Sequence, residues 1–443
     1  MFSKGAKKAL AWAGGFALLL VLLAAAPFLV PLEGFIPELS RLASEKLGQP
    51  VAVAELRLHL LPTPRAVAKG IVVGKRQEVT IGELQIVLDL SSLVSGTRAV
   101  RLIRASDVVL KEAALAIPGR MPKTAGSGEQ VRINAVELRN VKLLHPTLRL
   151  PEFDLRAELG DGLAIEKALL QTTDGALSLV IDPQGGGLSK VLLRAKEWTV
   201  PAGPPLRLEE LAAEGTLKGQ RLDVPSVAGR LYGGKLSGGM RAEWGKIWQV
   251  SGKASVDGVD LVPLQGALGK KAQLSGRLKA DATFAARGRT PEQLQNAVSL
   301  DGPFQVIGGE YHGYDLSKMS VRQLEAGGST RFDQLTGQVQ VRGREVRVTE
   351  LCARSPSLVV GGNVTIAPDT RLSGKLDVSV TQTGGFVGIP VSLGGTTAEP
   401  SFSPTKGYVI GATIGTLLLP GIGTSLGASA GSRIEGGAGS GCK

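Results

Sequence analysis

A seven-residue cassette recurs through the C-terminal half of this 443-residue chain. Its pattern is apolar, Ser or Thr, Gly, any residue, apolar, any residue, apolar. In an extended chain, side chains alternate between two faces, so the glycine and the apolar positions of a cassette share one face. Each cassette therefore predicts a strand of an antiparallel sheet with one apolar and one wetted face. The copies span residues 236–242, 250–256, 274–280, 335–341 and 372–378, with a looser copy at 300–306.

The repetition of one-sided strands predicts a mainly β fold. Further alternating stretches at 84–90, 131–135, 153–159 and 345–351 extend the pattern. Open sheets of more than about ten strands tend to curl. We therefore expect a long curved antiparallel β-sheet that forms a groove, with few short helices. The cassette glycines, such as Gly276, mark points where the sheet bends or where another chain approaches closely.

The N-terminus predicts a membrane anchor. Residues 9–30 carry no charge, which gives a helix long enough to cross a hydrocarbon core of about 30 Å. Lysines such as Lys4 and Lys8 precede it and acidic residues follow it, so residues 1–8 are expected in the cytoplasm and the body is exported. Small residues before Pro27 imitate a cleavage site, but a proline there obstructs signal peptidase, so we expect an uncleaved anchor.

Two short helices are expected outside the anchor. One covers residues 37–47, with Gly48 as its stop signal. Its apolar face lies either on a membrane surface or against the beginning of the sheet, and we favour the second because exposed strands need cover. Another helix begins at Thr290, where Gln293 completes a capping arrangement.

Several short motifs, in this order along the chain, resemble the AsmA family. LGQPV at 47–51 and LPTP at 61–64 resemble its N-terminal region, which extends here to residue 110. GGEYHGYDL at 308–316 and TRF at 330–332 resemble its C-terminal module. The resemblance implies an inner-membrane anchor, a periplasmic β-rich body and a relation to bridge-like lipid transfer proteins, which shield acyl chains in an apolar groove.

This resemblance suggests a division of the chain into segments. They are a cytoplasmic N-terminus (1–8), a transmembrane anchor (9–30), an AsmA-like N-terminal β region with a short plug helix (31–118), a linker (119–130), a repetitive β groove (131–288), an AsmA-like C-terminal module (289–406) and a glycine-rich apolar tail (407–443).

The candidate lipid-contacting residues are apolar side chains expected to share the groove face. Burying aliphatic surface is worth about 25 cal/mol per Å², so a long apolar stripe needs cover from a second sheet or from lipid. Aromatic residues make up only 4% of the chain, and a closed sandwich would use more of them, so the composition favours an open groove. The candidates are Leu84, Ile86, Leu88, Leu90, Leu274, Leu278, Leu335, Val339, Val341, Leu372, Leu376 and Val378.

The uncharged segment 407–432 predicts a membrane-docking tail. Its glycines recur at the four-residue spacing that lets helices pack closely in a bilayer, although Pro420 interrupts any single straight span. A flexible terminus that associates only with the groove is the alternative. The candidate docking residues are Gly411, Gly415, Leu417, Leu418, Leu419, Gly423 and Gly427.

The sequence gives little support for catalysis or for nucleic-acid binding. His59, His145 and His312 stand apart, without Cys or acidic companions at metal-ligand spacing, so we expect no enzyme, no metal and no cofactor. The net charge is +12, but the basic residues are scattered singly and do not alternate with aromatic residues, as nucleic-acid binding needs. Cys352 and Cys442 lie far apart, the second in the predicted tail, so we expect no structural disulfide.

The sequence thus predicts an inner-membrane-anchored periplasmic protein that supports phospholipid transport between the inner and outer membranes through a hydrophobic β groove. Its partners would be phospholipid acyl chains, the inner membrane, and either the outer membrane or an envelope protein. An assembly factor for outer-membrane proteins, which binds clients through its sheet edges, is the alternative. An export-linked β-solenoid with a purely structural role is a third.

Overall fold

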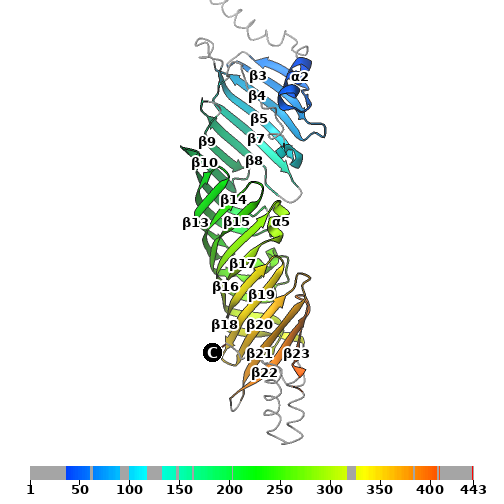
Figure 1. Cartoon of the computed structure of the whole chain (residues 1–443), viewed down its shortest axis with the longest axis vertical. Coiled ribbons are helices and arrows are strands. Elements are labelled where there is room, and N and C mark those ends of the chain that lie inside the picture. Colours follow the sequence, from blue (N-terminus) through cyan, green and yellow to red (C-terminus); the bar gives the residue numbers. More distant parts are fainter. Residues whose placement is uncertain are drawn as a thin grey trace, which may run out of the picture. The chain divides into compact units, whose positions relative to one another are not determined.

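The chain is mainly β, as its sequence predicts (Figure 1). It divides into two compact units, unit 1 (residues 1–193) and unit 2 (residues 194–443). The computed structural model describes residues 36–59, 63–89, 99–116, 132–145, 149–161, 164–201, 203–316, 326–382, 385–406, 409 and 442.

The predicted membrane segments fall outside these residues. The anchor at 9–30 precedes them, and the candidate docking residues of the tail, from Gly411 to Gly427, lie in the undescribed stretch 410–441. Leu90 is also outside. In the part of the chain that the structure describes, no helix is both long and apolar enough to cross a membrane.

Unit 1 is a mixed ladder of strands. Its edge consists of β1 (Val51–Ala52) and β2 (Glu55–His59), which both pair with β3 (Arg65–Val73). The ladder continues through β4 (Val79–Leu88), β5 (Ala99–Lys111), β7 (Ala135–Leu144), β8 (Phe153–Leu159), β9 (Ile165–Thr172) and β10 (Leu177–Gly185). The next strand, β11 (Leu188–Thr199), contains the division between the units.

The prediction of a wholly antiparallel sheet is wrong at β5. This strand runs parallel to β7 and to the short β6 (Arg132–Ile133). Parallel neighbours need a crossover of a dozen or more residues, and the chain between Lys111 and Arg132 provides one. The predicted linker 119–130 lies within this crossover, after which the chain rejoins the same sheet. The 3₁₀ helix Glu112–Ala116 starts the crossover and buries Ala114.

Helix α2 (Ile36–Leu47) forms where the sequence predicts it, and Gly48 ends it with a φ of 64°. Its C-terminal end meets the sheet: Leu47 packs on the cluster around Ile71, and the Ser44 hydroxyl accepts a 2.8 Å hydrogen bond from the amide of Val51. Leu39 and Leu42 near its beginning are exposed. Only the end of the helix therefore covers the beginning of the sheet.

Unit 2 is an antiparallel ladder in chain order. Each strand pairs with the next, and the five cassettes and the looser copy all lie within strands, which confirms the strand prediction for them. The strands are β12 (Arg207–Lys218), β13 (Arg221–Leu231), β14 (Gly234–Glu243), β15 (Trp248–Asp260), β16 (Leu274–Gly288), β17 (Ser299–Tyr314), β18 (Ala326–Arg342), β19 (Glu345–Ser355), β20 (Leu358–Ile366), β21 (Leu372–Gln382), β22 (Gly385–Gly395) and β23 (Pro400–Pro404).

Helix α5 (Pro291–Asn296) connects β16 to β17 and starts with the predicted cap. The Thr290 hydroxyl accepts a 3.2 Å hydrogen bond from the amide of Gln293, and the Gln293 side chain accepts one of 2.8 Å from the amide of Arg289. The first bond caps the helix, and the second goes to the amide of the residue before the N-cap, one position earlier than in the standard capping box.

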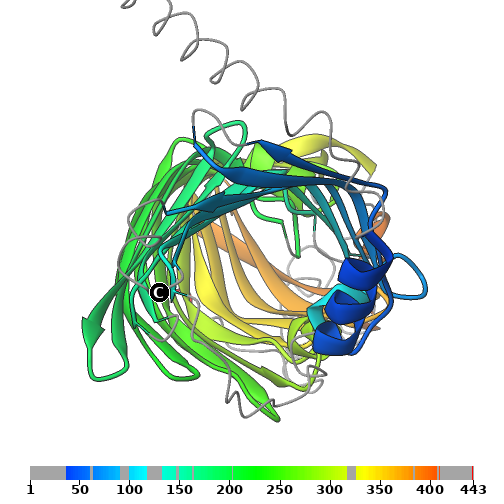
Figure 2. The same cartoon turned by 90° about the horizontal axis from the view of Figure 1, so that it is seen from above.

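The ladder of unit 2 curls toward one face. Tyr314 at the end of β17 and Phe402 in β23 are separated by the intervening strands β18 to β22. Their ring centroids nevertheless lie 4.8 Å apart, and the Tyr314 hydroxyl donates a 2.7 Å hydrogen bond to the carbonyl of Pro400. The ladder must bend to bring these residues together, and Figure 2 shows the curvature of the yellow and orange strands.

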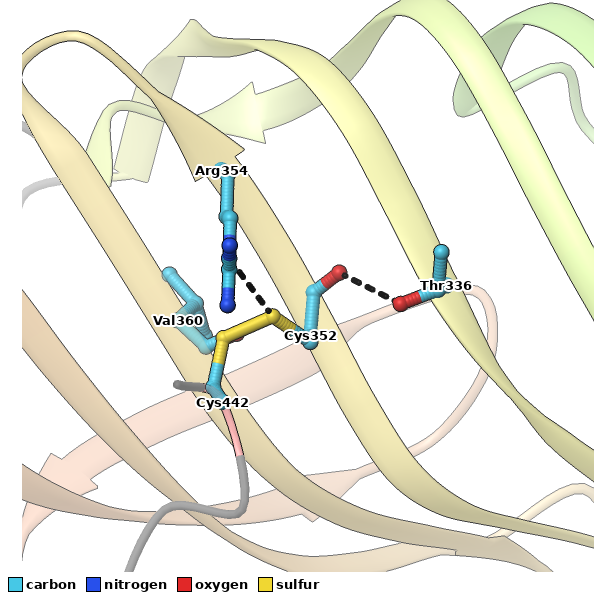
Figure 3. Close-up of a disulfide and its surroundings, with 5 residues drawn as sticks. All are labelled: Thr336, Cys352, Arg354, Val360 and Cys442. Carbon is cyan, nitrogen blue, oxygen red and sulfur yellow. Dashed lines mark hydrogen bonds between the residues drawn. A yellow bond between two sulfur atoms is a disulfide. The ribbon is translucent and has the colours of Figure 1, made fainter.

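The prediction of no disulfide is also wrong. Cys352 in β19 and Cys442 form one, with their Cα atoms 5.3 Å apart (Figure 3). Cys352 lies opposite Thr336 of β18 and Gly361 of β20. The 90-residue separation in sequence suggested distant thiols, but the fold returns residue 442 to β19. Pairing of cysteines depends on this long-range return, which no local pattern in the sequence encodes.

We expect Cys442→Ser to lower the free energy of unfolding of unit 2 by about 2–4 kcal/mol, because a bond that closes a long loop restricts the unfolded chain. The measurement is the midpoint of thermal unfolding by circular dichroism, with and without reductant. Reductant should bring the wild-type midpoint down to that of the variant and leave the variant unchanged. Equal midpoints for the oxidised wild type and the variant would contradict the prediction.

Candidate functional site

Each strand of unit 2 separates apolar from polar side chains. Across β14, β15 and β16, Leu236 pairs with Val256, and Val256 pairs with Ala280. We call the face that these residues share the apolar face of unit 2. The side chains between them point to the opposite, polar face and are exposed: Lys235, Ser237, Lys253, Asp257 and Lys279.

Aromatic rings lie across glycines on the apolar face. Gly252 pairs with Phe284, and a Cβ atom at Gly252 would lie 2.7 Å from Cζ of that ring. Gly337 has the same relation to Phe304, at 2.9 Å from Cε1. These cassette glycines are therefore sites of close approach. Gly276 instead has a φ of +126° at a register shift between β16 and β17, where the strand is irregular.

Protein closes the apolar face at its C-terminal end. One cluster joins β20, β21 and β22 to Leu316, which follows β17, and to Phe402 of β23. Two of the candidates chosen from the sequence lie inside this cluster: Leu376 is 6% exposed and Val378 is 0% exposed. The other buried members include Leu358, Val360, Ile389 and Val391.

Helix α4 (Leu261–Ala267) covers the apolar face along one rim of the sheet. Leu264 of this helix packs on both the cluster around Val259 and the cluster around Val306. The candidate Leu278 belongs to both clusters, and the candidates Leu274 and Leu335 pack on the second. These three side chains are thus partly buried in clusters to which the helix contributes.

Helix α4 was not predicted from the sequence. Its signal is Asp260, whose carboxylate accepts a 3.0 Å hydrogen bond from the amide of Val262 and so caps the first turn. Gln265 fixes the helix to the start of β16: its side-chain oxygen accepts hydrogen bonds from the amides of Gln273 and Leu274, at 3.2 and 3.3 Å. The strand-like alternation before Asp260 concealed this short helix.

A row of apolar side chains next to the other rim is only partly buried. These side chains pair in register from strand to strand, apart from one diagonal step between Ala286 and Leu300. All are partly exposed, and none packs on a buried cluster in the described part of the chain. We call this the open row: Leu222, Ala242, Val250, Ala286, Leu300, Val341, Val346, Ile366 and Leu372.

Two candidates from the sequence, Val341 and Leu372, belong to the open row, and Val339 lies beside it on the same face. The structure thus separates the unit 2 candidates into an open set, a set under α4 and a buried pair. Contact of any of them with lipid stays a prediction.

The candidates in unit 1 share one face of β4. Leu84 packs on the clusters around Ile71 and Val108, whereas Ile86 is partly exposed and Leu88 is exposed. Leu84 and Ile86 pair with Ala105 and Ile103 of β5, which continue the apolar face. Unit 1 therefore repeats the arrangement of unit 2, with one part of its apolar face packed and another part partly open.

A cluster of ion pairs lies on the polar face of unit 1. Glu137 lies 2.8 Å from Nε of Arg104, 3.3 Å from Arg139 and 3.8 Å from Arg156. Burial raises the pKa of Glu137, but the hydrogen bond from Arg104 and the charges of the three arginines outweigh it, so the pKa lies below its usual value. The carboxylate is thus a charged ion-pair partner at neutral pH and is poorly suited to proton transfer.

Comparison with known protein families finds a match for part of the chain. The AsmA family model matches residues 202–350. This segment contains β12 to β18, helices α4 and α5, and most of the open row. Neither the curated proteins nor the solved structures contain a match to the chain. The segment 47–110 lies outside the matched residues, so its resemblance to the N-terminal region stays a prediction.

We expect Gly252→Ala to lower the free energy of unfolding by about 1–3 kcal/mol. The added Cβ would lie 2.3 Å from the carbonyl oxygen of Gly239 and 2.7 Å from Phe284, so backbone and ring must both shift. The measurement is the midpoint of chemical unfolding. Gly266→Ala is the control, because no atom outside the neighbouring backbone of α4 lies within 4 Å of its added Cβ, and its midpoint should not fall.

Proposed function

Since the chain belongs to the AsmA family through residues 202–350, we propose that it supports phospholipid transport between the inner and outer membranes by shielding acyl chains on its apolar face. The observation that carries this proposal is the open row. It runs across the ladder from β13 to β21 and consists of apolar side chains that remain partly exposed.

Elementary energetics favour an apolar ligand for this row. Each Å² of aliphatic surface removed from water contributes about 25 cal/mol, so a row of partly exposed Leu, Val and Ile side chains gains by contact with acyl chains. The contact is nonspecific and has no fixed stopping point, because successive strands offer similar side chains. A ligand could therefore move along the row without any chemical step, and we propose no enzymatic activity.

The cellular setting is part of the proposal. A disulfide between Cys352 and Cys442 fits an oxidising compartment such as the periplasm, and cytosolic proteins rarely keep one. The uncharged segment 9–30 with lysines before it supports an inner-membrane anchor with its N-terminus in the cytoplasm. The outer membrane or an envelope protein would receive the lipid.

Val250→Glu tests the proposal at the open row. A carboxylate in contact with acyl chains must lose its hydration or lose the ligand, so we expect the purified variant to carry at least about tenfold less bound phospholipid than the wild type. Ser251→Glu is the matched control, because residue 251 is exposed on the polar face and pairs with Arg241. It should leave the bound lipid unchanged.

Bound phospholipid is measured by mass spectrometry per mole of protein, and the thermal midpoint of each variant reports whether it folds. A photocrosslinker at residue 341 should form lipid adducts in cells, whereas one at the buried residue 378 should form none. Exclusively protein adducts at residue 341 would favour the assembly-factor alternative and contradict lipid transport.

A further inference from the structure

The turns at one rim of unit 2 form a continuous line. We call the turns at residues 218–221, 244–248, 287–290 and 342–345 the basic rim. The amide of Trp244 donates a 3.0 Å hydrogen bond to the carbonyl of Gln220, Trp248 pairs with Gly288, and the amide of Gly343 donates a 2.7 Å hydrogen bond to the carbonyl of Val298. Helix α5, labelled in Figure 1, belongs to the same rim.

The basic rim carries unneutralised positive charge. On the neighbouring polar face, several arginines are paired with carboxylates, for example Arg241 with Asp223 at 2.5 Å, whereas Lys235, Lys253 and Lys279 form no ion pair with a described residue. Two rim arginines are paired as well, Arg221 with Asp223 and Arg342 with Asp301. Five further rim cations are exposed and form no ion pair with any residue that the structure describes: Lys218, Lys246, Arg287, Arg289 and Arg344.

Aromatic side chains accompany this charge. The turn between β14 and β15 has the sequence Trp244-Gly-Lys-Ile-Trp248 and so contains two of the four tryptophans of the chain. Trp248 is 42% exposed although it is a large side chain. Tryptophan combines an apolar ring with a polar N–H group and is favoured, together with lysine, at the boundary between lipid chains and water.

The open row lies directly beside the basic rim. Arg221 immediately precedes Leu222, Arg287 follows Ala286, Arg342 follows Val341, and Trp248 stands two residues before Val250. An acyl chain on the open row would therefore place its headgroup at the rim and not on the opposite rim, where α4 covers the apolar face.

We propose that the basic rim binds the phosphate groups of anionic phospholipids, while the open row holds their acyl chains. This inference rests on the proposed function and adds a preference for negative headgroups. The cations attract the phosphate, and Trp244 and Trp248 lie at the depth of the glycerol region. The open row alone would bind acyl chains nonspecifically, and the basic rim adds a fixed orientation for each bound lipid.

The test compares two charge reversals of equal size. Lys246→Glu with Arg289→Glu removes two unpaired cations from the basic rim. Lys270→Glu with Lys271→Glu makes the same change at two exposed cations after α4, on the other rim. The full-length protein in an uncharged detergent is incubated with equal amounts of phosphatidylglycerol and phosphatidylcholine, and both bound lipids are quantified by mass spectrometry.

We expect the wild type to enrich phosphatidylglycerol over phosphatidylcholine by about fivefold or more, since each cation near an anionic headgroup contributes about that factor. Reversal at the basic rim should abolish the enrichment without changing the total lipid bound, and the control reversal should leave both unchanged. The enrichment should also fall as salt is raised.

The outcomes separate the two proposals. A wild type that binds neither lipid contradicts the proposed function itself. Bound lipid without enrichment, or enrichment that survives the reversal at the basic rim, overturns only the headgroup proposal. If the lipid-free protein binds inorganic phosphate through the basic rim and phosphatidylglycerol does not displace it, the rim is a site for the free anion and the headgroup proposal is also overturned.

Discussion

The structure depends on one constraint: the alternation of side chains along an extended strand, which assigns every second residue to the same face. Unit 2 follows this alternation along its strands, and bulges shift it at several points, for example between Asp257 and Val259 of β15. A slip of one residue in any strand would turn its leucines to water and its lysines to the apolar face, so the register is strongly specified. Since each strand pairs with its neighbour in sequence, the apolar face continues from one hairpin to the next.

Other parts of the protein cover the apolar face of unit 2 unevenly. The covered part stabilises the fold, and the partly exposed part is available for binding. At the C-terminal end, branched side chains such as Val378 and Val391 are fully buried, and Tyr314 reaches Phe402 to close the curl. In the middle, the face uses Ala and Gly, with phenyl rings lying across glycines. The first region supplies burial that stabilises the fold. The second leaves a shallow surface whose exposure has no evident structural purpose.

The sequence predicts the features that depend on residues close together along the chain. The cassettes identify strands, and Thr290 with Gln293 identifies a helix start, because parity and capping act over a few residues. The features that the sequence did not predict depend on contacts between distant residues. They are the parallel pairing of β7 with β5, the disulfide between Cys352 and Cys442, and the burial of Val378. Parity places Val378 on the apolar face, but only the closure by Leu316 and Phe402 decides that this residue is covered.

The same closure limits the path of a lipid on the proposed function. The open row ends at Leu372 of β21, and the cluster around Val378 occupies the rest of the face between β20 and β22. Helix α4 covers the rim opposite the open row, and Gln265 ties that helix to β16. Protein therefore covers both of these sides. A lipid on the open row could leave over the basic rim, where Trp248 is exposed and five cations form no ion pair with any residue that the structure describes.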